Sequence, residues 1–391
     1  MHKQLLIVGG SHADIPVIQA AKKLGYTVIT TGNNPQDRGH PYADSYYAAD
    51  YSNPKEILAL AKQLHIDAVC ASANDFSAIS CAYVAQKLHL PGHDSYETAL
   101  IMHHKDRFRS FALTNGIRVP KAETLALNDN PIEKAKKLSY PLIVKPVDLS
   151  GGKGISKVET PHALEHAVAS ALRATKAHNI VMEEYIEGSN HGYSTFIKNQ
   201  KVVFGFMDDE HYYLNPYLVS GASTSIHYHQ HIIQSLNNDL EKIASKLSLV
   251  DGLLHVQFIL QDKTPYIIEI CRRTPGDLYV KLVEYATGFD MSDAIVRSVT
   301  DQPILNYTIK ELGFITRHCV MSSQRGKIKN VTYGRFAKRM FSRFSFWDPG
   351  DAIEDYLTYK AEIDFIRYNT KEEARRLIPE LTKQIKIEFD T

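Results

Sequence analysis

The stretch VKPVDLSGGKGISKV, residues 144–158, decides the fold, because it joins the end of an apolar strand to a glycine-rich loop. Lys145 directly follows the apolar letters LIV, where its charge is costly to desolvate unless it meets an anion. A salt-bridge partner or a phosphate would meet this need. The loop favours phosphate, because glycines let backbone N–H groups approach phosphate oxygens closely. On its own such a loop is also typical of a surface turn, and the Walker A pattern GxxxxGK[ST] is absent.

Two further stretches follow in the order that a nucleotide site needs. VMEEYIEG, residues 181–188, places a pair of carboxylates on an apolar strand. HVQF, residues 255–258, and IIEICRR, residues 267–273, place a carboxamide and a carboxylate on what we predict to be neighbouring strands. The order indicates a phosphate-binding loop, then a strand that binds adenine, then a site for a metal ion.

The last two segments are predicted to form a hairpin with its polar side chains on one face. If the turn QDKTP is centred on Lys263, Gln257 lies opposite Glu269. Alternation then points Ile268 toward the core and places Arg273 on the face of Glu269. A carboxylate beside a guanidinium suits a magnesium-bound nucleotide, because Mg²⁺ prefers oxygen ligands and arginine neutralises phosphoryl charge. A plain Glu–Arg ion pair is the alternative.

The N-terminal region alternates between strand and helix patterns. QLLIV, ADIPVIQAAKKLG and YTVIT predict a β-α-β unit, and the alternation continues to about residue 92, as in a Rossmann-like parallel sheet. The first turn, GGSHAD, lacks the GxGxxG fingerprint, so Gly9 is interpreted as part of a structural turn rather than of an NAD or FAD site. Asn74 and Asp75 follow the strand IDAVCAS, at the end of the sheet where such folds bind ligands.

The remainder of the chain predicts a mainly antiparallel α+β body. Strand patterns occur at YPLIVKP, NIVMEEYI, YSTFIK, KVVFGFM, LLHVQFIL and PYIIEIC, with helices near residues 131–138, 161–176 and 234–248. GFITRHCVM and GKIKNVTY are further strands. The C-terminal segment predicts a helix followed by a short strand.

Composition restricts the kind of protein. The chain has 391 residues and a formal net charge of +1, which argues against general attraction to nucleic acid or to an anionic membrane. Four cysteines at unrelated spacings predict neither a CxxC pair nor a disulfide framework. No signal peptide or spanning apolar run is found, so a cytoplasmic protein is expected. The motif HYHQH, with His227, His229 and His231 on one side, could bind zinc, but a solvated loop or the edge of a substrate pocket is the favoured interpretation.

Taken in order, the glycine loop, the EEYI strand and the VQF and EICRR strands resemble the ATP-grasp superfamily. The resemblance implies a Rossmann-like preliminary domain followed by two α+β lobes that clasp ATP. It covers nearly the whole chain and implies the following domains: residues 1–94, Rossmann-like; 95–305, ATP-grasp, with a central ATP lobe at 120–190 and a metal-binding lobe at 191–305; 306–391, a strand-rich part completing the ATP-grasp lobe.

The resemblance also implies roles for single residues. The phosphates would be contacted by Lys105 and Lys145 and covered by the loop Ser150, Gly151, Gly152, Lys153 and Gly154. The adenine amino group would donate to Glu183, and the adenine edge would be completed by the backbone of Glu184, Tyr185 and Ile186. Gln257 and Glu269 would hold Mg²⁺ or Mn²⁺, and Arg273 and Lys153 would act on the transferring phosphoryl group.

Three positions depart from the superfamily pattern. Asn190 stands where many members have a ribose-binding glutamate, although it is still expected at the nucleotide. Gln257 replaces a carboxylate at the first metal position, a change tolerated in carbamoyl-phosphate synthetases. Cys271 stands where asparagine is common, which removes one protein oxygen from the metal site.

The resemblance implies an ATP-dependent ligase for small molecules. The leading hypothesis is a carboxylate–amine ligase that forms an amide or peptide-like bond through an acyl phosphate, with ADP and phosphate as products. A bicarbonate-activating carboxylase or carbamoyl-type enzyme is one alternative. A regulatory protein that binds nucleotide without turnover is the other, favoured by Asn190 and Cys271. A homodimer is a reasonable expectation.

Overall fold

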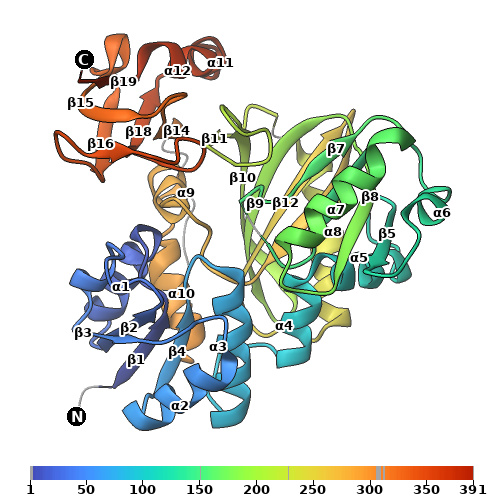
Figure 1. Cartoon of the computed structure of the whole chain (residues 1–391). Helices are drawn as coiled ribbons and strands as arrows, with labels where there is room; N and C mark the ends of the chain where they lie inside the picture. The colour runs from blue at the N-terminus through green and yellow to red at the C-terminus, as the bar shows by residue number, and fades with distance from the viewer. Residues whose placement is uncertain (1–2, 150, 228, 305–309, 311–312, 391) are drawn as a thin grey trace. The chain divides into compact units, whose positions relative to one another are not determined.

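The computed structural model describes residues 3–149, 151–227, 229–304, 310 and 313–390 (Figure 1). The chain divides into two compact units. The first comprises Met1–Phe206, Tyr228–Gly276 and Ser292–Leu305, and the second comprises Met207–His227, Asp277–Met291 and Asn306–Thr391. Within the described ranges, no helix has both the length and the apolar character needed to cross a membrane. The domain boundaries expected from the sequence remain a prediction.

The first unit begins with a parallel sheet, drawn in blue in Figure 1, whose strand order is β3-β2-β1-β4. Its strands are β1 (Gln4–Val8), β2 (Thr27–Gly32), β3 (Ser45–Ala48) and β4 (Ala68–Ala71), and its helices are α1 (Ile15–Lys23), α2 (Pro54–Leu64) and α3 (Asp75–Leu88). Ile57 of α2 and Val84 of α3 pack with Leu6 and Val8 of β1 in one core. The Rossmann-like prediction is confirmed; β3 is an element that the sequence did not reveal.

Side chains from two different turns fix the start of α3. Asn74 caps the helix by accepting a hydrogen bond from the backbone of Phe76, as expected of an N-cap asparagine. Asp14, at the start of α1, accepts from the backbone N–H of Ala73 over 2.9 Å. Gly9 has φ +142°, and a Cβ there would lie 2.3 Å from the Cβ of Ser72, so only glycine fits this turn. These contacts determine where Asp75 emerges from the sheet.

The helical stretch after residue 95 is broken into α4 (Tyr96–His103) and α5 (Lys105–Thr114). The break occurs at His104, whose backbone is extended with φ −106° and ψ 120°. Lys105 thereby becomes the first residue of α5, and its N–H donates to the carbonyl of Val147. In a single continuous helix the N–H of Lys105 would bond within the helix and not to Val147.

A second sheet of the first unit is antiparallel, with the order β5-β8-β6-β7. Its strands are β5 (Ala122–Ala126), β6 (Leu142–Pro146), β7 (Ser156–Val158) and β8 (Asn179–Glu184), with α6 (Pro131–Ala135) and α7 (Leu164–Ala174). Val144 and Met182 are buried in the core with Ala171 of α7. Because side chains alternate along a strand, Lys145 and Glu183 lie together on the opposite face.

The first unit also contains the hairpin of β12 (Gly252–Gln261) and β13 (Thr264–Cys271), with α8 (Gln230–Lys246). The order β13-β12-β9-β10 continues through β9 (Ser189–Lys198) into β10 (Lys201–His211), whose last residues belong to the second unit. Gln257 pairs with Glu269, which confirms the predicted register at the polar face, and His255 pairs with Cys271.

The predicted turn of this hairpin is wrong. Gln261 pairs with Thr264, so the turn is only Asp262 and Lys263, and Asp262 has φ +55°. Phe258 pairs with Ile267, and the register shifts before the Gln257–Glu269 pair, so Ile268 is an extra residue in a β-bulge. Ile268 is half-buried, whereas Ile267 is fully buried, which corrects the expectation that Ile268 faces the core.

The second unit is built on the antiparallel order β10-β11-β14-β18-β16 and on the small sheet β17-β15-β19. Its strands are β11 (Gly221–Thr224), β14 (Phe314–Val320), β15 (Gly326–Thr332), β16 (Met340–Ser345), β17 (Ala352–Ile353), β18 (Glu362–Tyr368) and β19 (Lys386–Phe389). The helices are α9 (Tyr279–Thr287), α11 (Lys371–Leu377) and α12 (Leu381–Gln384), while α10 (Met291–Val299) lies mostly in the first unit. The predicted fold class, a parallel N-terminal sheet followed by mainly antiparallel α+β structure, is confirmed; α9 and α10 were not predicted.

Candidate functional site

A buried ion cluster lies on the face of the β5-β8-β6-β7 sheet that is opposite the apolar core. Lys145 Nζ lies 2.8 Å from Glu183 Oε2, and Arg109 Nε lies 2.8 Å from Glu183 Oε1. Burial lowers the pKa of Lys145 to about 8, because the positive charges of Arg109 and Lys105 add to the effect and Glu183 opposes it only in part. Burial would raise the pKa of Glu183, but Arg109 and Lys145 outweigh it and hold that pKa below its ordinary value.

Arg109 is a residue of this cluster that the sequence analysis missed. It lies one helical turn after Lys105 on α5, so both side chains project from the same face of the helix. The side chain is 2% exposed, and its Nη2 donates to the carbonyl of Ile268 in the β-bulge. The spacing KDRFR was the available signal, because a second cation four residues after a phosphate-contacting lysine faces the same site.

Positive charge exceeds negative charge in this cluster. Lys105, Lys145 and Arg109 act on one another, and Glu183 is the carboxylate paired with two of them. Arg109 Nη1 is buried without a hydrogen-bond partner. A buried cation needs an anionic partner, so the cluster fits a phosphate group. Lys145 therefore has the salt-bridge partner that was one of the two expectations. The other expectation, a phosphate, stays a prediction that the excess positive charge of the cluster favours.

The residues predicted to hold a metal ion lie directly opposite each other. Gln257 of β12 and Glu269 of β13 form a register pair, and both side chains are half-buried. In the part of the chain that the structure describes, no group of three or more His, Cys, Asp or Glu side chains could hold a metal by itself. One carboxylate and one carboxamide fit Mg²⁺, which takes few protein ligands and completes its shell with phosphate oxygens and water.

Arg273 is held by Asp75, the first residue of helix α3. Its Nε donates to Asp75 Oδ1 over 2.9 Å, and Asp75 Oδ1 also lies 3.0 Å from His103 Nδ1. Burial would raise the pKa of Asp75, but the charge of Arg273 and the contacts with His103 lower it well below its ordinary value. The carboxylate that binds the guanidinium is therefore that of Asp75, the first residue of α3, and the shared face predicted for Glu269 and Arg273 stays a prediction.

One small cavity lies between several of these residues. It is lined by Lys105 and Arg109 of α5, by Glu269 of β13, and by Asp75 and His103. A predicted phosphate ligand and a predicted metal ligand thus face the same space. This is the arrangement needed to bring a nucleotide phosphate and a metal ion together.

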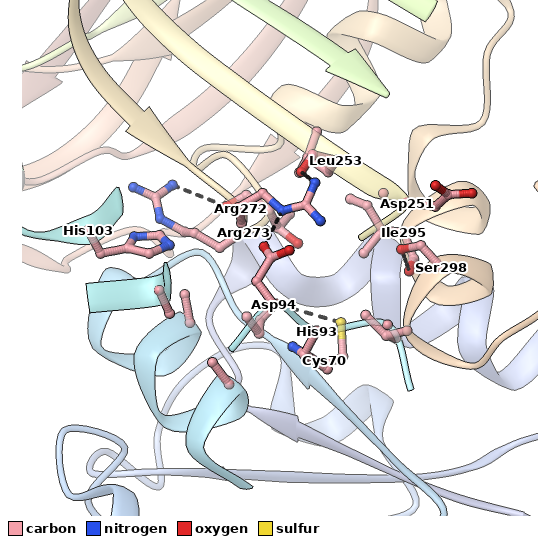
Figure 2. A pocket seen from close by; sticks show the side chains of 18 residues that line it. Cys70, His93, Asp94, His103, Asp251, Leu253, Arg272, Arg273, Ile295 and Ser298 are labelled. Atoms are coloured by element: carbon pink, nitrogen blue, oxygen red, sulfur yellow. Dashed lines mark hydrogen bonds and ion pairs between the residues drawn. The ribbon is translucent and has the colours of Figure 1, made fainter. Parts of the chain in front are cut away.

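A larger cavity lies beside it and shares His103 as a lining residue. Figure 2 shows His103 at one end of this cavity and Asp251 and Ser298 at the other. Arg272 lies in the wall of this cavity. Its Nε donates to Asp94 Oδ2 over 2.8 Å, and its two Nη atoms donate to the backbone carbonyls of Leu253 and Val250. Because its donors are used in this way, Arg272 is a structural residue of the wall.

The predicted phosphate loop has the backbone that its glycines allow. Gly151, Gly152 and Gly154 have φ between +70° and +75°, a region that other residues adopt only with strain. A Cβ at Gly154 would lie 2.9 Å from side-chain atoms of Pro146 and Ala174. Lys153 is exposed, and Ser150 lies outside the described residues. The role of this loop at the phosphates stays a prediction.

The predicted adenine and ribose residues follow in β8 and β9. The N–H groups of Glu184 and Tyr185 donate to the carbonyls of Lys121 and Pro141, and the side chain of Glu184 accepts from the backbone of Ser139. Ile186 and Asn190 are half-buried, and Asn190 pairs with Ile259 of β12. None of these four residues lines the charged cavity. Their roles at a nucleotide stay predictions.

Comparison with known families finds a match in the central part of the chain. Residues 107–276 match the family model described as the ATP-grasp domain. The matched range contains Arg109, Lys145, Glu183, Glu269 and Arg273, while Asp75, His103 and Lys105 precede it. The resemblance noted from the sequence is thereby confirmed.

Solved structures share the fold over the whole chain. An L-amino acid ligase from Bacillus licheniformis has a TM-score of 0.84 at 19% identity, covering 100% of this chain and 99% of that one. Phosphoribosylglycinamide synthetase from Anaerococcus prevotii has a TM-score of 0.79 at 21% identity, covering 100% of both chains. The biotin carboxylase domain of the Hydrogenobacter thermophilus 2-oxoglutarate carboxylase, a dimer with MgADP and bicarbonate, has a TM-score of 0.77 at 19% identity, covering 99% and 91%.

Proposed function

This chain carries an ATP-grasp domain, and from that premise we propose that it is an ATP-dependent ligase joining a small-molecule carboxylate to an amine. The observation that carries the proposal is the shared cavity of Lys105 and Glu269, with Arg273 bound to Asp75 beside it. Cations, a metal ligand and an oriented guanidinium are what the meeting of a carboxylate with a nucleotide phosphate requires, because both reactants are anions.

In the proposed reaction the substrate carboxylate attacks the γ-phosphorus of ATP. A P–O bond forms, the bond to ADP breaks, and an acyl phosphate results. The amine nitrogen then attacks the acyl carbon, the C–N bond forms, and phosphate leaves. The overall balance is a carboxylate, an ammonium and ATP giving an amide, ADP, phosphate and one proton.

The chain's own residues would lower the barrier in three ways. Lys105 and Lys145 would neutralise the phosphates, with Lys145 keeping its position through Glu183. Arg273, fixed by Asp75, would stabilise charge on the transferring phosphoryl group. The glycine loop with Lys153 would cover the site and exclude water that would hydrolyse an acyl phosphate.

Mg²⁺ or Mn²⁺ would be held by Gln257 and Glu269. When bound, the ion would reduce the repulsion between the phosphates and the attacking carboxylate. Cys271 is buried beside this pair and offers a thiol rather than an oxygen, so water and phosphate would supply more of the ion's ligands.

The test is ADP release by the purified protein with Mg-ATP and a panel of amino acids and other small carboxylates, with and without amines. Hydroxylamine is added in parallel, because it captures an acyl phosphate as a stable hydroxamate. Turnover that needs a carboxylate, gives a hydroxamate and is lost in Glu269→Ala would support the ligase. Absence of carboxylate-dependent turnover and of hydroxamate across the panel would contradict it.

A bicarbonate-activating enzyme is a second candidate, favoured by one comparison: a neighbour of the same fold binds bicarbonate with ADP. Turnover that follows bicarbonate and ignores other carboxylates would establish this reading. Nucleotide binding without any turnover would instead favour a regulatory protein, for which Asn190 and Cys271 are the supporting departures.

Cellular setting and assembly belong to the same proposal. All four cysteines, Cys70, Cys81, Cys271 and Cys319, are buried and unpaired, as expected of a protein from a reducing cytoplasm. A homodimer is proposed because a structural neighbour is a dimer. Sedimentation of the purified protein would decide the oligomeric state.

A further inference from the structure

Amide formation at neutral pH needs a proton acceptor that none of the predicted site residues provides. Alkyl amines have pKa values near 10 and α-amino groups near 8, so the incoming amine is largely an ammonium without a free electron pair. Lys105, Lys145 and Arg273 are cations, and Glu269 would be used to hold the metal ion. A further residue must take the proton before nitrogen can attack.

His103 has the geometry of such an acceptor. It is the last residue of α4, its side chain is 1% exposed, and it lines both the cavity of Lys105 and Glu269 and the larger neighbouring cavity. Its Nδ1 lies 3.0 Å from Asp75 Oδ1, while its Nε2 is buried without a hydrogen-bond partner. A buried ring nitrogen without a partner is uncommon, because it loses its bond to water.

The neighbouring charges determine which ring nitrogen is free to accept. Asp75 stays a carboxylate because Arg273 and His103 hold its pKa far below the ordinary value. A carboxylate only accepts hydrogen bonds, so Nδ1 carries the hydrogen and Nε2 presents its electron pair. Once His103 is protonated, Asp75 stabilises the imidazolium.

The remaining charged groups around His103 partly oppose one another. Arg273 lines the larger cavity with His103, and Lys105 and Arg109 line the smaller one; these cations disfavour a second positive charge nearby. Glu269, a carboxylate in the lining of the smaller cavity, favours it. Asp75 is the group in direct contact, so its charge acts most strongly on the ring.

Two other histidines near the hairpin and the cavities are poor acceptors. Burial lowers the pKa of His255 to about 3, and its Nδ1 lies 2.6 Å from Ser194 Oγ. His93 lines the larger cavity, but its Nε2 already bonds to the carbonyl of Val69 over 2.8 Å. Neither presents a free nitrogen to the charged cavity.

We propose that His103, oriented by Asp75, is the general base that deprotonates the amine, an inference that rests on the proposed ligase function. Nε2 takes one proton from the ammonium, the freed electron pair of nitrogen attacks the acyl carbon, and the C–O bond to phosphate breaks. The second proton leaves nitrogen as the amide forms, and phosphate and water carry both protons away. The substrate class is a primary amine that is protonated at neutral pH.

The test compares two nucleophiles in the full-length protein. Hydroxylamine is mostly unprotonated at neutral pH and needs no base, whereas the amine from the panel that supports turnover does. His103→Asn keeps an N–H donor near Asp75 but has no basic nitrogen. His93→Gln is the matched control, because its amide can keep the bond to Val69.

The expected result separates the two reactions. His103→Asn should form hydroxamate at nearly the wild-type rate but lose amide formation by about 10²- to 10⁴-fold at neutral pH, the range that general bases supply. The loss should shrink as the pH approaches the pKa of the amine, and His93→Gln should behave as wild type.

Three outcomes would overturn the inference. Amide formation at the wild-type rate in His103→Asn excludes a general base at this position. A parallel fall in hydroxamate and amide assigns His103 to phosphoryl transfer or to folding. A wild-type protein that makes no hydroxamate overturns the proposed function itself, which distinguishes the two failures.

Discussion

Arg273 Nε donates a hydrogen bond to Asp75 Oδ1 over 2.9 Å, across 198 residues of sequence. The bond links the first residue of α3, which follows β4 of the parallel sheet, to the residue two positions after β13. Its consequence is that the orientation of Arg273 depends on a residue of the N-terminal region. We therefore expect this region to contribute to the proposed site.

Asp75→Asn should weaken both the fold and phosphoryl transfer. The amide keeps the shape but removes the charge that compensates Arg273, and breaking a buried ion pair typically costs about 3–5 kcal/mol. Urea unfolding measures the stability, and hydroxamate formation measures phosphoryl transfer. Asp262→Asn, in the exposed hairpin turn, is the control and should change neither.

Arg109→Met should disconnect Glu183 from the β-bulge at Ile268. We expect a loss of about 3–5 kcal/mol in the free energy of unfolding, because Glu183 and Lys145 remain buried with one cation removed. ATP affinity, measured by titration calorimetry, should also fall. Arg107→Met, on the exposed side of α5, is the control, and equal effects of both substitutions would contradict a specific role for Arg109.

Glu269→Gln should raise the Mg²⁺ concentration needed for activity. The substitution removes the carboxylate of the metal pair and leaves two carboxamides, Gln257 and the new side chain. We expect turnover at limiting Mg²⁺ to fall by about 100-fold, with partial recovery at high Mg²⁺. An unchanged Mg²⁺ dependence would show that the ion binds elsewhere.

Lys145 should make ATP binding depend on pH. Burial and neighbouring cations lower its pKa to about 8 in the free protein, and a bound phosphate favours the charged form and so raises that pKa. Affinity for a non-hydrolysable ATP analogue should therefore be highest below pH 8 and fall as the pH rises through it. In Lys145→Arg the guanidinium does not titrate, so this fall should disappear.

Gly154→Ala should destabilise the loop that follows β6. The residue has φ +70°, a conformation that costs about 1–2 kcal/mol for other residues, and the new Cβ would press on Pro146 and Ala174. Gly25→Ala shares the positive φ but meets no atom within 4 Å, so it measures strain alone. Gly276→Ala has neither feature and should lie within about 0.5 kcal/mol of wild type. Thermal unfolding of the three variants separates contact from strain.

Sequence alone determined two local features of the proposed site. The position of Lys145 after the apolar letters LIV predicted a buried charge that needs an anionic partner, and the pairing of Gln257 with Glu269 was predicted before the fold was known. Side-chain alternation is a local property of a strand, so it can be read from neighbouring residues. The same local reasoning failed at the turn, because a two-residue turn followed by the bulge at Ile268 gives the same pairing as the longer turn that was expected.

Only the tertiary structure decided which faces meet. Asp75 follows β4, His103 ends α4 and Arg109 lies within α5, and no spacing in the sequence relates them to Arg273 or to Glu183. Their contacts arise because separately formed helices and sheets pack through their apolar faces and bring polar side chains together at the edges. Packing of this kind depends on the shapes of whole helices and sheets. For that reason the sequence could not predict the orientation of Arg273 or the position of His103 in the lining of the cavity.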